Sequence, residues 1–432
     1  MYRNKGTITV FLSLISMLFL SLFCTMAESV RVQAARFQAA AAFDMGLFSI
    51  FGEYDRVLLE EYDLWFLDGS SEEQKIREVL ETKLEKYIQP NINPRYNLAA
   101  GRSWDVFPTE LDRCTVDKYA LATDHGGQVF YSQAVENQKE LFVGEAASAL
   151  KKNIKQMEEG HQKGEEYQNE EQKADEEYQR AQAAQMEEKK RQESEKENAE
   201  KQEESDTDIK ETEAVQAKVE NPLDQIKKIK SMGILGLVLK DGTVVSDKTI
   251  ERKNLPSERN LQKGSLLVNE ISADPVSEAI FLNYLQKHFQ CAVDEGGKHQ
   301  KGSKEHSLSY ELEYIIGGQK SDRENLKKTV NRILLIREGM NYATLAKSAK
   351  MRGEAMALAA AITGAAALPE FAGALQKLLM LAWAYGESLL DVRTLLAKGK
   401  VPMLKAETEW KLPLEKLGML AEVLKECDAG GG

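Results

Sequence analysis

Residues Thr7 to Ala27 read TITVFLSLISMLFLSLFCTMA, and this stretch decides the architecture of the chain. It holds 21 residues and no charged side chain. An α-helix rises about 1.5 Å per residue, so the stretch is long enough to cross the ~30 Å hydrocarbon core of a bilayer. The sequence therefore predicts a transmembrane helix at residues 7–27, with membrane lipid as its partner.

The charges that flank this segment predict its orientation. Arg3 and Lys5 precede it, and the first charge after it is Glu28. Basic residues favour the cytoplasmic side of a membrane. We therefore expect a single-pass protein of the cell membrane, with residues 1–6 as a cytoplasmic leader and the bulk of the chain extracellular. Two arginines shortly after Glu28 make this bias modest.

The alternative is a cleaved secretory signal, because Thr25-Met-Ala27 is an acceptable small-residue cleavage site. Two features favour retention. The apolar run exceeds the ~7–15 residues of a signal core, and helix-forming sequence continues straight through Ala27. Cys24 is a poor lipoprotein anchor because the bulky Phe23 precedes it. Processing after Gly6, processing after Ala27 and no processing all stay open at this point.

Residues 28–157 are predicted to form the amino-terminal part of an ectodomain. We expect the membrane helix to continue to about Trp65, because an apolar stripe recurs there at steps of three and four residues. The stripe would pack into a core or, alternatively, contact neighbouring helices, as in filament subunits. It consists of Leu47, Phe51, Tyr54, Leu58, Tyr62 and Trp65.

Three further elements are predicted in this part. A second amphipathic helix covers Glu72 to Ile88. The strands Cys114–Thr123 and Gln128–Ala134 flank a glycine turn and have the shape of a β-hairpin. A helix from Val135 to Met157 follows.

Residues 158–221 are predicted to be a charged low-complexity linker. From Glu158 to Glu204 there are 17 acidic and 8 basic side chains, so this stretch carries −9 of the net charge of −12. Between Glu158 and Asp208 there is no Ile, Leu, Val, Phe or Trp. Such a composition buries too little apolar surface to offset the entropy of ordering, and it has no heptad seam for a coiled coil. We expect a solvated tether, helical in part at most; partner binding by the tether is an alternative.

Residues 222–426 are predicted to form the carboxyl-terminal part of the ectodomain, followed by a tail at 427–432. Asp274 and Ser321 are placed to cap two helices. Alternation in Ser307–Ile316 predicts a strand, which would join the hairpin in one small antiparallel sheet covered by helices. The fold class is thus mainly α, α+β. Three further helices are expected over Asp322–Lys350, Met351–Leu368 and Glu370–Leu396, the last two as a pair buried against the domain.

The chemistry-bearing residues form no recognisable active site. Gly317 to Ser321 follows the predicted strand, but Gln319 breaks the glycine-lysine step of a phosphate loop. Ser148 and Lys151 make an SxxK without the companion motifs of a penicillin-binding site. Glu311 and Glu313 would share one exposed strand face. The four cysteines form no CxxC pair and the five histidines no ligand spacing, and the acidic balance argues against nucleic acid. We predict no enzyme activity, and no catalytic, cofactor-binding or metal-binding residue.

Several segments carry a family resemblance. They are Lys5-Gly-Thr-Ile-Thr-Val-Phe, Ala27-Glu-Ser-Val-Arg31, Tyr54 to Leu64, Tyr310 to Gly318, Asn325-Leu, Arg337, Ala382 to Arg393 and Val401-Pro. They resemble an uncharacterised family of exported proteins from clostridial Gram-positive bacteria. That family is similar at its start to TadE/TadG-like components of tight-adherence (Flp-type) pilus systems. The likeness spans most of the chain except the charged linker.

The resemblance implies a role in a pilus or secretion system, with pilin-like proteins and assembly machinery as partners. One departure matters. Pilin-like precursors often carry Glu at the fifth position after a leader that ends in glycine, and here that residue is Phe11. This argues against a bulk filament subunit and leaves a minor or accessory component. The alternatives are an envelope-binding protein unrelated to pili and a divergent cell-envelope enzyme.

Overall fold

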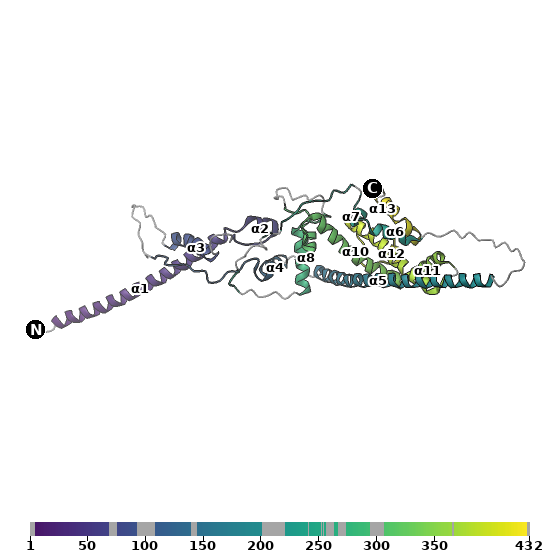
Figure 1. Ribbon diagram of the computed structural model, residues 1–432. Coiled ribbons are helices and arrows are strands. Elements are labelled where there is room, and N and C mark those ends of the chain that lie inside the picture. Colours follow the sequence, from purple (N-terminus) through teal and green to yellow (C-terminus); the bar gives the residue numbers. More distant parts are fainter. Residues whose placement is uncertain are drawn as a thin grey trace. The chain divides into compact units, whose positions relative to one another are not determined.

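The computed structural model describes residues 5–68, 76–92, 109–139, 145–200, 221–240, 242–251, 253, 255, 263–266, 274–293, 306–364 and 367–429. In this part the chain is mainly helical, with two isolated β-bridges and no β-strand (Figure 1). The predicted helical character is confirmed, and the predicted small sheet is not found. The chain divides into unit 1, Met1–Leu141 with Leu255–Ala273, and unit 2, Phe142–Asn254 with Asp274–Gly432.

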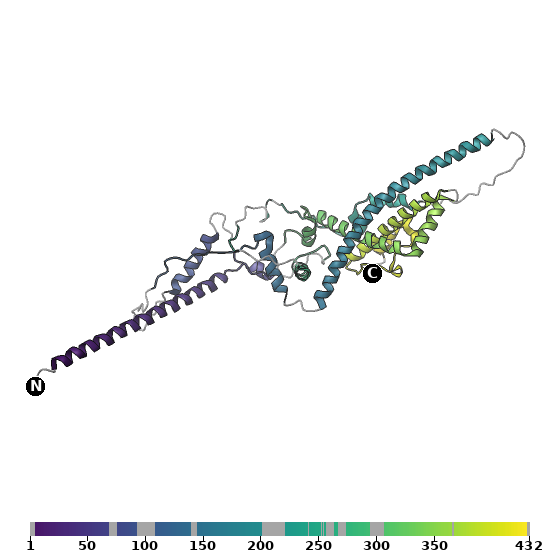
Figure 2. The same cartoon turned by 90° about the horizontal axis from the view of Figure 1, so that it is seen from below.

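Unit 1 begins with α1 (Lys5–Phe51), which runs through Ala27 as one uninterrupted helix (Figure 2). Among the described residues it is the one helix long and apolar enough to cross a membrane, and a signal sequence would share that character. The helix ends before the predicted Trp65. Asp55 starts a separate helix, α2 (Arg56–Tyr62), by accepting hydrogen bonds from the backbone N–H groups of Val57 and Leu58. The predicted stripe from Leu47 to Trp65 therefore does not form one helical face.

Helix α3 (Ile76–Ile92) packs along α1, as Figures 1 and 2 both show. The predicted helix began at Glu72, outside the described residues. Ala42 and Ile50 of α1 are buried in a cluster with Leu84 and Ile88 of α3. Gly46 permits this approach, because a Cβ atom there would lie 2.5 Å from Cγ1 of Ile88.

The predicted β-hairpin is wrong. Residues 114–121 are irregular, and Gln128–Ala134 lies inside α4 (Asp124–Lys139). Gly126 and Gly127 have φ of 71° and 91°, so the expected turn conformation is present, but it leads into a helix. Ala134 and Gln138 are buried one turn apart, and burial at this spacing fixes the segment as a helix.

Unit 2 is built around α12, which is buried on every side from Leu378 to Val392. A helix that is apolar all round is stable only inside a protein or a membrane. Here α5, α6, α10 and α11 cover it, so the expectation of a buried helix packed on its alanine-rich neighbour is confirmed. The helices are α5 (Glu145–Glu200), α6 (Pro222–Lys230), α7 (Ile234–Val238), α8 (Pro275–His288), α9 (Glu311–Gly317), α10 (Asp322–Lys347), α11 (Ala349–Thr363), α12 (Pro369–Leu396) and α13 (Leu420–Ala429). Two 3₁₀ segments, Glu407–Glu409 and Leu414–Met419, lie between α12 and α13.

Both predicted helix caps of unit 2 are confirmed. The carboxylate of Asp274 accepts hydrogen bonds from the backbone N–H groups of Val276 and Ser277 at the start of α8. The hydroxyl of Ser321 accepts one from the N–H of Glu324 at the start of α10. Each cap satisfies donors that the first turn of a helix leaves unpaired.

The strand predicted at Ser307–Ile316 is wrong, because its second half is α9. Gly318 ends α9 in the left-handed conformation, with φ of 62°. The carboxylate of Asp322 accepts hydrogen bonds from the N–H groups of Ser309 and Tyr310 at 2.9 and 3.2 Å. These donors are therefore satisfied by a side chain and need no neighbouring strand.

The solvated tether predicted from residue 158 is instead part of α5, at least to Glu200; residues 201–220 lie outside the described part. Among the buried positions along α5 are Gly160, Gly164, Tyr167 and Ala174. Their steps of four, three and seven residues form a seam with a heptad period. The seam is made of glycine, alanine and tyrosine, so a search for larger aliphatic residues does not find it.

Glycines bring α5 and α10 into close contact. A Cβ atom at Gly164 would lie 2.8 Å from the carbonyl oxygen of Leu335, and one at Gly339 would overlap the backbone of Lys163 and Gly164. The two backbones therefore meet where both helices lack a side chain. The hydroxyl of Tyr167 also donates a 3.0 Å hydrogen bond to the carbonyl of Leu381 in α12, which ties α5 to the centre of unit 2.

Candidate functional site

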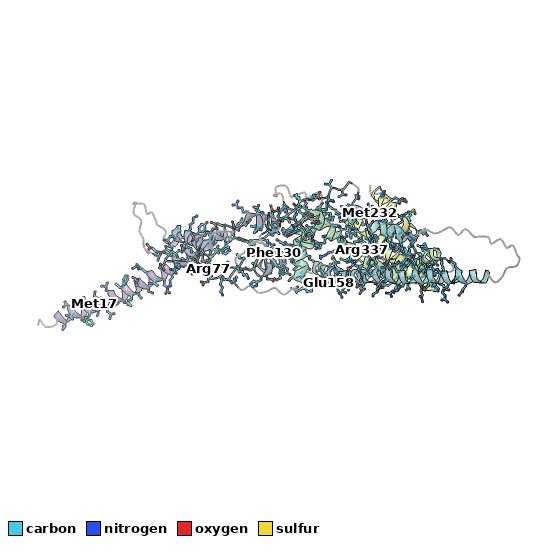
Figure 3. The ribbon with its side chains drawn as sticks, in the orientation of Figure 1. Met17, Arg77, Phe130, Glu158, Met232 and Arg337 are labelled. Carbon is cyan, nitrogen blue, oxygen red and sulfur yellow. The ribbon has the colours of Figure 1, made fainter. Side chains whose placement is uncertain are left out.

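A group of buried polar side chains lies between α10 and α12 of unit 2. Each helix contributes two polar side chains one turn apart, and all four are buried (Figure 3 labels Arg337). They are Arg337 and Asn341 on α10, and Glu387 and Asp391 on α12. Residues four apart lie on the same face of a helix, so the two pairs can face each other.

Arg337 organises the first half of this buried ionic network. Its Nε and Nη2 atoms donate to Oδ2 of Asp391 at 3.0 and 2.7 Å. Its Nη1 atom donates to the carbonyl oxygens of Pro402 and Met403, both at 2.9 Å. Asn341 donates to the same Asp391 oxygen at 2.9 Å. The guanidinium group thus joins both helices to the segment that follows α12.

Lys405 organises the second half. It is 5% exposed, and its ammonium group pairs with Glu387 and with Oδ1 of Asp391, the latter at 2.5 Å. The Glu387 carboxylate also accepts hydrogen bonds from the N–H groups of Lys411 and Leu412, at 3.0 and 2.8 Å. This half fixes the chain from residue 405 to 412 against α12.

The network is electrically balanced, with two cations and two carboxylates. Every charged member is buried and hydrogen-bonded, so none is offered to a substrate. Buried ion pairs of this kind add little net stability, but the loss of one partner leaves an uncompensated charge. The arrangement is a structural clamp that holds the segment after α12 in one register.

A second buried group lies where α5, α6, α10 and α12 meet. Burial raises the pKa of Glu338 to about 8, against the attraction of Lys230 and with a small contribution from Glu171. Lys230 pairs with Glu171, and its Nζ lies 4.8 Å from the ring centroid of Tyr385. Burial likewise raises the pKa of Tyr385. Glu338 is therefore largely protonated at neutral pH, without a full counter-charge of its own.

A cavity of about 580 Å³ opens beside the clamped segment, between α11, α12 and residues 407–415. Trp383 and Trp410 line it, with ring centroids 5.6 Å apart in an edge-to-face arrangement. The Nε1 atom of Trp383 donates to the carbonyl of Leu412 at 2.6 Å. The volume of the cavity lies within the range of small-molecule binding sites.

Two of the candidate motifs of the sequence lie at the ends of α9 and α10. Gly317 to Ser321 ends α9 and caps α10, as the capping interpretation requires. Glu311 and Glu313 lie in the first turn of α9 and accept hydrogen bonds from the N–H groups of Gln290 and Ala292. The side chains of Ser148 and Lys151 lie outside the described part of the structure. No cluster of His, Cys, Asp or Glu suited to a metal occurs in the part that is described.

The ionic network was not predicted from the sequence. The signal was nevertheless present, because two carboxylates one turn apart in a long apolar helix require buried partners. Their partners, Arg337 and Lys405, come from distant parts of the sequence and cannot be chosen without the fold.

The structure defines a helical domain that follows a membrane-length amino-terminal helix. Residues 212–432, slightly more than half of the chain, match the family described as "Family of unknown function (DUF5702)", and the chain belongs to this family. Residues 212–432 contain the whole ionic network. Helix α5, which packs on α10 and α12, precedes the residues matched by the family. No curated protein and no solved structure matches the chain.

Proposed function

We propose that the chain is a non-enzymatic, single-pass membrane protein that serves as a minor or accessory component of a pilus or secretion system in the Gram-positive envelope. In this proposal residues 7–27 lie in the cell membrane and the amino terminus is cytoplasmic. The chain beyond residue 27 is then extracellular, and the protein's partners are pilin-like proteins and their assembly machinery.

One observation carries the membrane part of the proposal. The apolar window of α1 is entirely uncovered by the rest of the chain, and the helix continues unbroken across the candidate cleavage site at Ala27. An exposed apolar surface of this size is strongly unfavourable in water and favourable in lipid. The basic residues Arg3 and Lys5 support a cytoplasmic amino terminus.

The pilus part rests on the likeness of the amino-terminal segment to TadE/TadG-like proteins. The clamp in unit 2 is consistent with a non-enzymatic role, because it uses its charged groups to hold the fold together. A second candidate, an anchored envelope-binding protein unrelated to pili, is favoured by the tryptophan-lined cavity beside the clamp.

Three measurements on the full chain in its native host test the proposal. The protein should sediment with membranes and resist alkaline carbonate extraction, and its amino terminus should be Met1 or Thr7. After replacement of the native cysteines by serine, a Glu166→Cys variant should react with a membrane-impermeant maleimide on intact cells. Purification from detergent-solubilised membranes should recover pilin-like and assembly proteins. A mature chain that begins at Glu28 would remove the anchor, and membrane retention with only unrelated envelope partners would favour the second candidate.

A further inference from the structure

The part of α1 beyond residue 27 has two different faces. Ala42, Gly46 and Ile50 face α3 and are buried. On the opposite face Phe37 is 78% exposed and Phe48 is 84% exposed. Phenylalanine side chains seldom stand this far out of a folded surface, and several on one face mark a contact site.

Four exposed side chains and the half-buried Ala41 form a continuous seam. Phe23, Val30 and Phe37 repeat every seven residues, and Ala41 and Phe48 continue the seam at steps of four and seven. Such spacing keeps side chains in line along a helix that packs against a second helix. Phe23 lies within the membrane-length segment and is 73% exposed, so the seam runs from the lipid into the ectodomain.

This continuity restricts the occupant. A partner that follows the seam must lie parallel to α1 and enter the same membrane, so it is itself a membrane-anchored helix. Lipid can cover Phe23 but cannot reach Phe48, because Phe48 lies about 30 Å along the helix from residue 27, where the membrane segment ends. Each phenylalanine offers roughly 150–250 Å² for burial, so three with Val30 approach the ~800 Å² per partner of a standard interface.

Asp44 distinguishes a second copy from a different partner. It falls seven residues after Phe37, on the same seam position, and it is exposed. In a parallel, in-register pair of identical chains the two Asp44 carboxylates would face each other, and like charges at such positions disfavour pairing. A partner with lysine or arginine at that level would instead form a complementary contact.

We propose that the seam from Phe23 to Phe48 binds a different membrane-anchored protein through a parallel helix that carries a basic residue opposite Asp44. This inference rests on the membrane anchor of the proposed function. It identifies the partner by its chemistry: an apolar helix continuous with a membrane span, with a lysine or arginine about four to five turns beyond the end of that span.

Site-specific photocross-linking in native membranes tests the inference. The photoreactive residue p-benzoylphenylalanine replaces Phe37 or Phe48 in the full chain, and both sites are exposed, so folding is unaffected. The matched control places the same residue at Glu28, which is exposed and, being two residues before Val30, projects from roughly the opposite face. Mass spectrometry then identifies the cross-linked peptide.

The expected result is one heterologous adduct from Phe37 and Phe48, at least fivefold more abundant than from Glu28. Its cross-linked peptide should adjoin a membrane span and contain lysine or arginine. Asp44→Lys should reduce the adduct at least fivefold, whereas Glu28→Lys should leave it unchanged. An adduct of two identical chains, equal yields at Glu28, no adduct, or insensitivity to Asp44→Lys would each overturn the inference. Failure of the anchor itself is distinguishable, because the chain would then leave the membrane fraction.

Discussion

Replacement of Glu338 by glutamine should stabilise unit 2 at alkaline pH and leave its stability nearly unchanged at pH 5. Glu338 lies on α10 and is 8% exposed. The charged groups nearest to it are Lys230 on α6 and Glu171 on α5, and these two already form an ion pair with each other. Ionised Glu338 is therefore a buried charge with an incomplete counter-charge. Glutamine resembles the protonated form of Glu338 and cannot become charged.

The size of the effect follows from the pKa. Burial raises the pKa of Glu338 from 4.5 to about 8, so the folded state holds a proton that the unfolded state loses between these values. The stability of the wild-type chain should therefore fall as pH rises through this range. At about 1.4 kcal/mol per pKa unit, the loss between pH 5 and pH 8 is on the order of 3 kcal/mol. Glu338→Gln removes this titration, so its advantage should grow by the same amount.

Urea unfolding of the full chain in detergent micelles measures this difference. Trp65→Phe and Trp104→Phe in every variant leave Trp383 and Trp410 as reporters of unit 2 alone. Glu166→Gln, at an exposed position on α5, is the matched control and should show no growing advantage. A constant difference between Glu338→Gln and wild type from pH 5 to pH 8 would refute the reasoning, because it would mean that Glu338 ionises in the folded state as it does in the unfolded chain.

Three further predictions concern the packing of unit 2. Gly339→Leu should destabilise unit 2 by at least ~3 kcal/mol in the same urea assay, because the helix backbones leave no room for a side chain. The control Gly353→Ala, with open space around it, should be neutral or stabilising by up to ~1 kcal/mol. Equal effects of the two substitutions would contradict the close crossing of α5 and α10. Arg337→Met should lower the free energy of unfolding of unit 2 by about 3–5 kcal/mol. The double variant with Asp391→Leu should recover part of that loss, because the Asp391 carboxylate is then no longer left without its guanidinium partner. Strictly additive effects of the two substitutions would argue against the clamp. Cleavage at a protease site inserted within residues 201–220 should leave two fragments that co-elute on gel filtration, because α5 packs on α10 and α12. Separation of the fragments without denaturant would show that α5 is not part of the core.

The features that the sequence predicted correctly are those that neighbouring residues determine. An uncharged run of membrane length forms a helix in isolation, and the caps at Asp274 and Ser321 act on amides two or three residues away. The burial of α12 was also readable, because its apolar residues cover all sides and Pro369 marks its start. Each of these inferences needs no knowledge of distant contacts.

The remaining features depend on partners far away in the sequence. Ser307–Ile316 alternates like a strand, but within the described residues no strand pairs with it. Asp322 satisfies the amides of Ser309 and Tyr310, and the second half of the segment is α9. The sequence around Tyr167 is too polar to predict burial, and only the glycines of α5 and α10, more than 150 residues apart, allow those helices to approach closely enough to bury it. The sequence by itself determined the membrane-length segment, the two helix caps and the burial of α12. Tertiary structure decided which charges meet and where α5 belongs, because close packing and buried ion pairs depend on the positions of both partners at once.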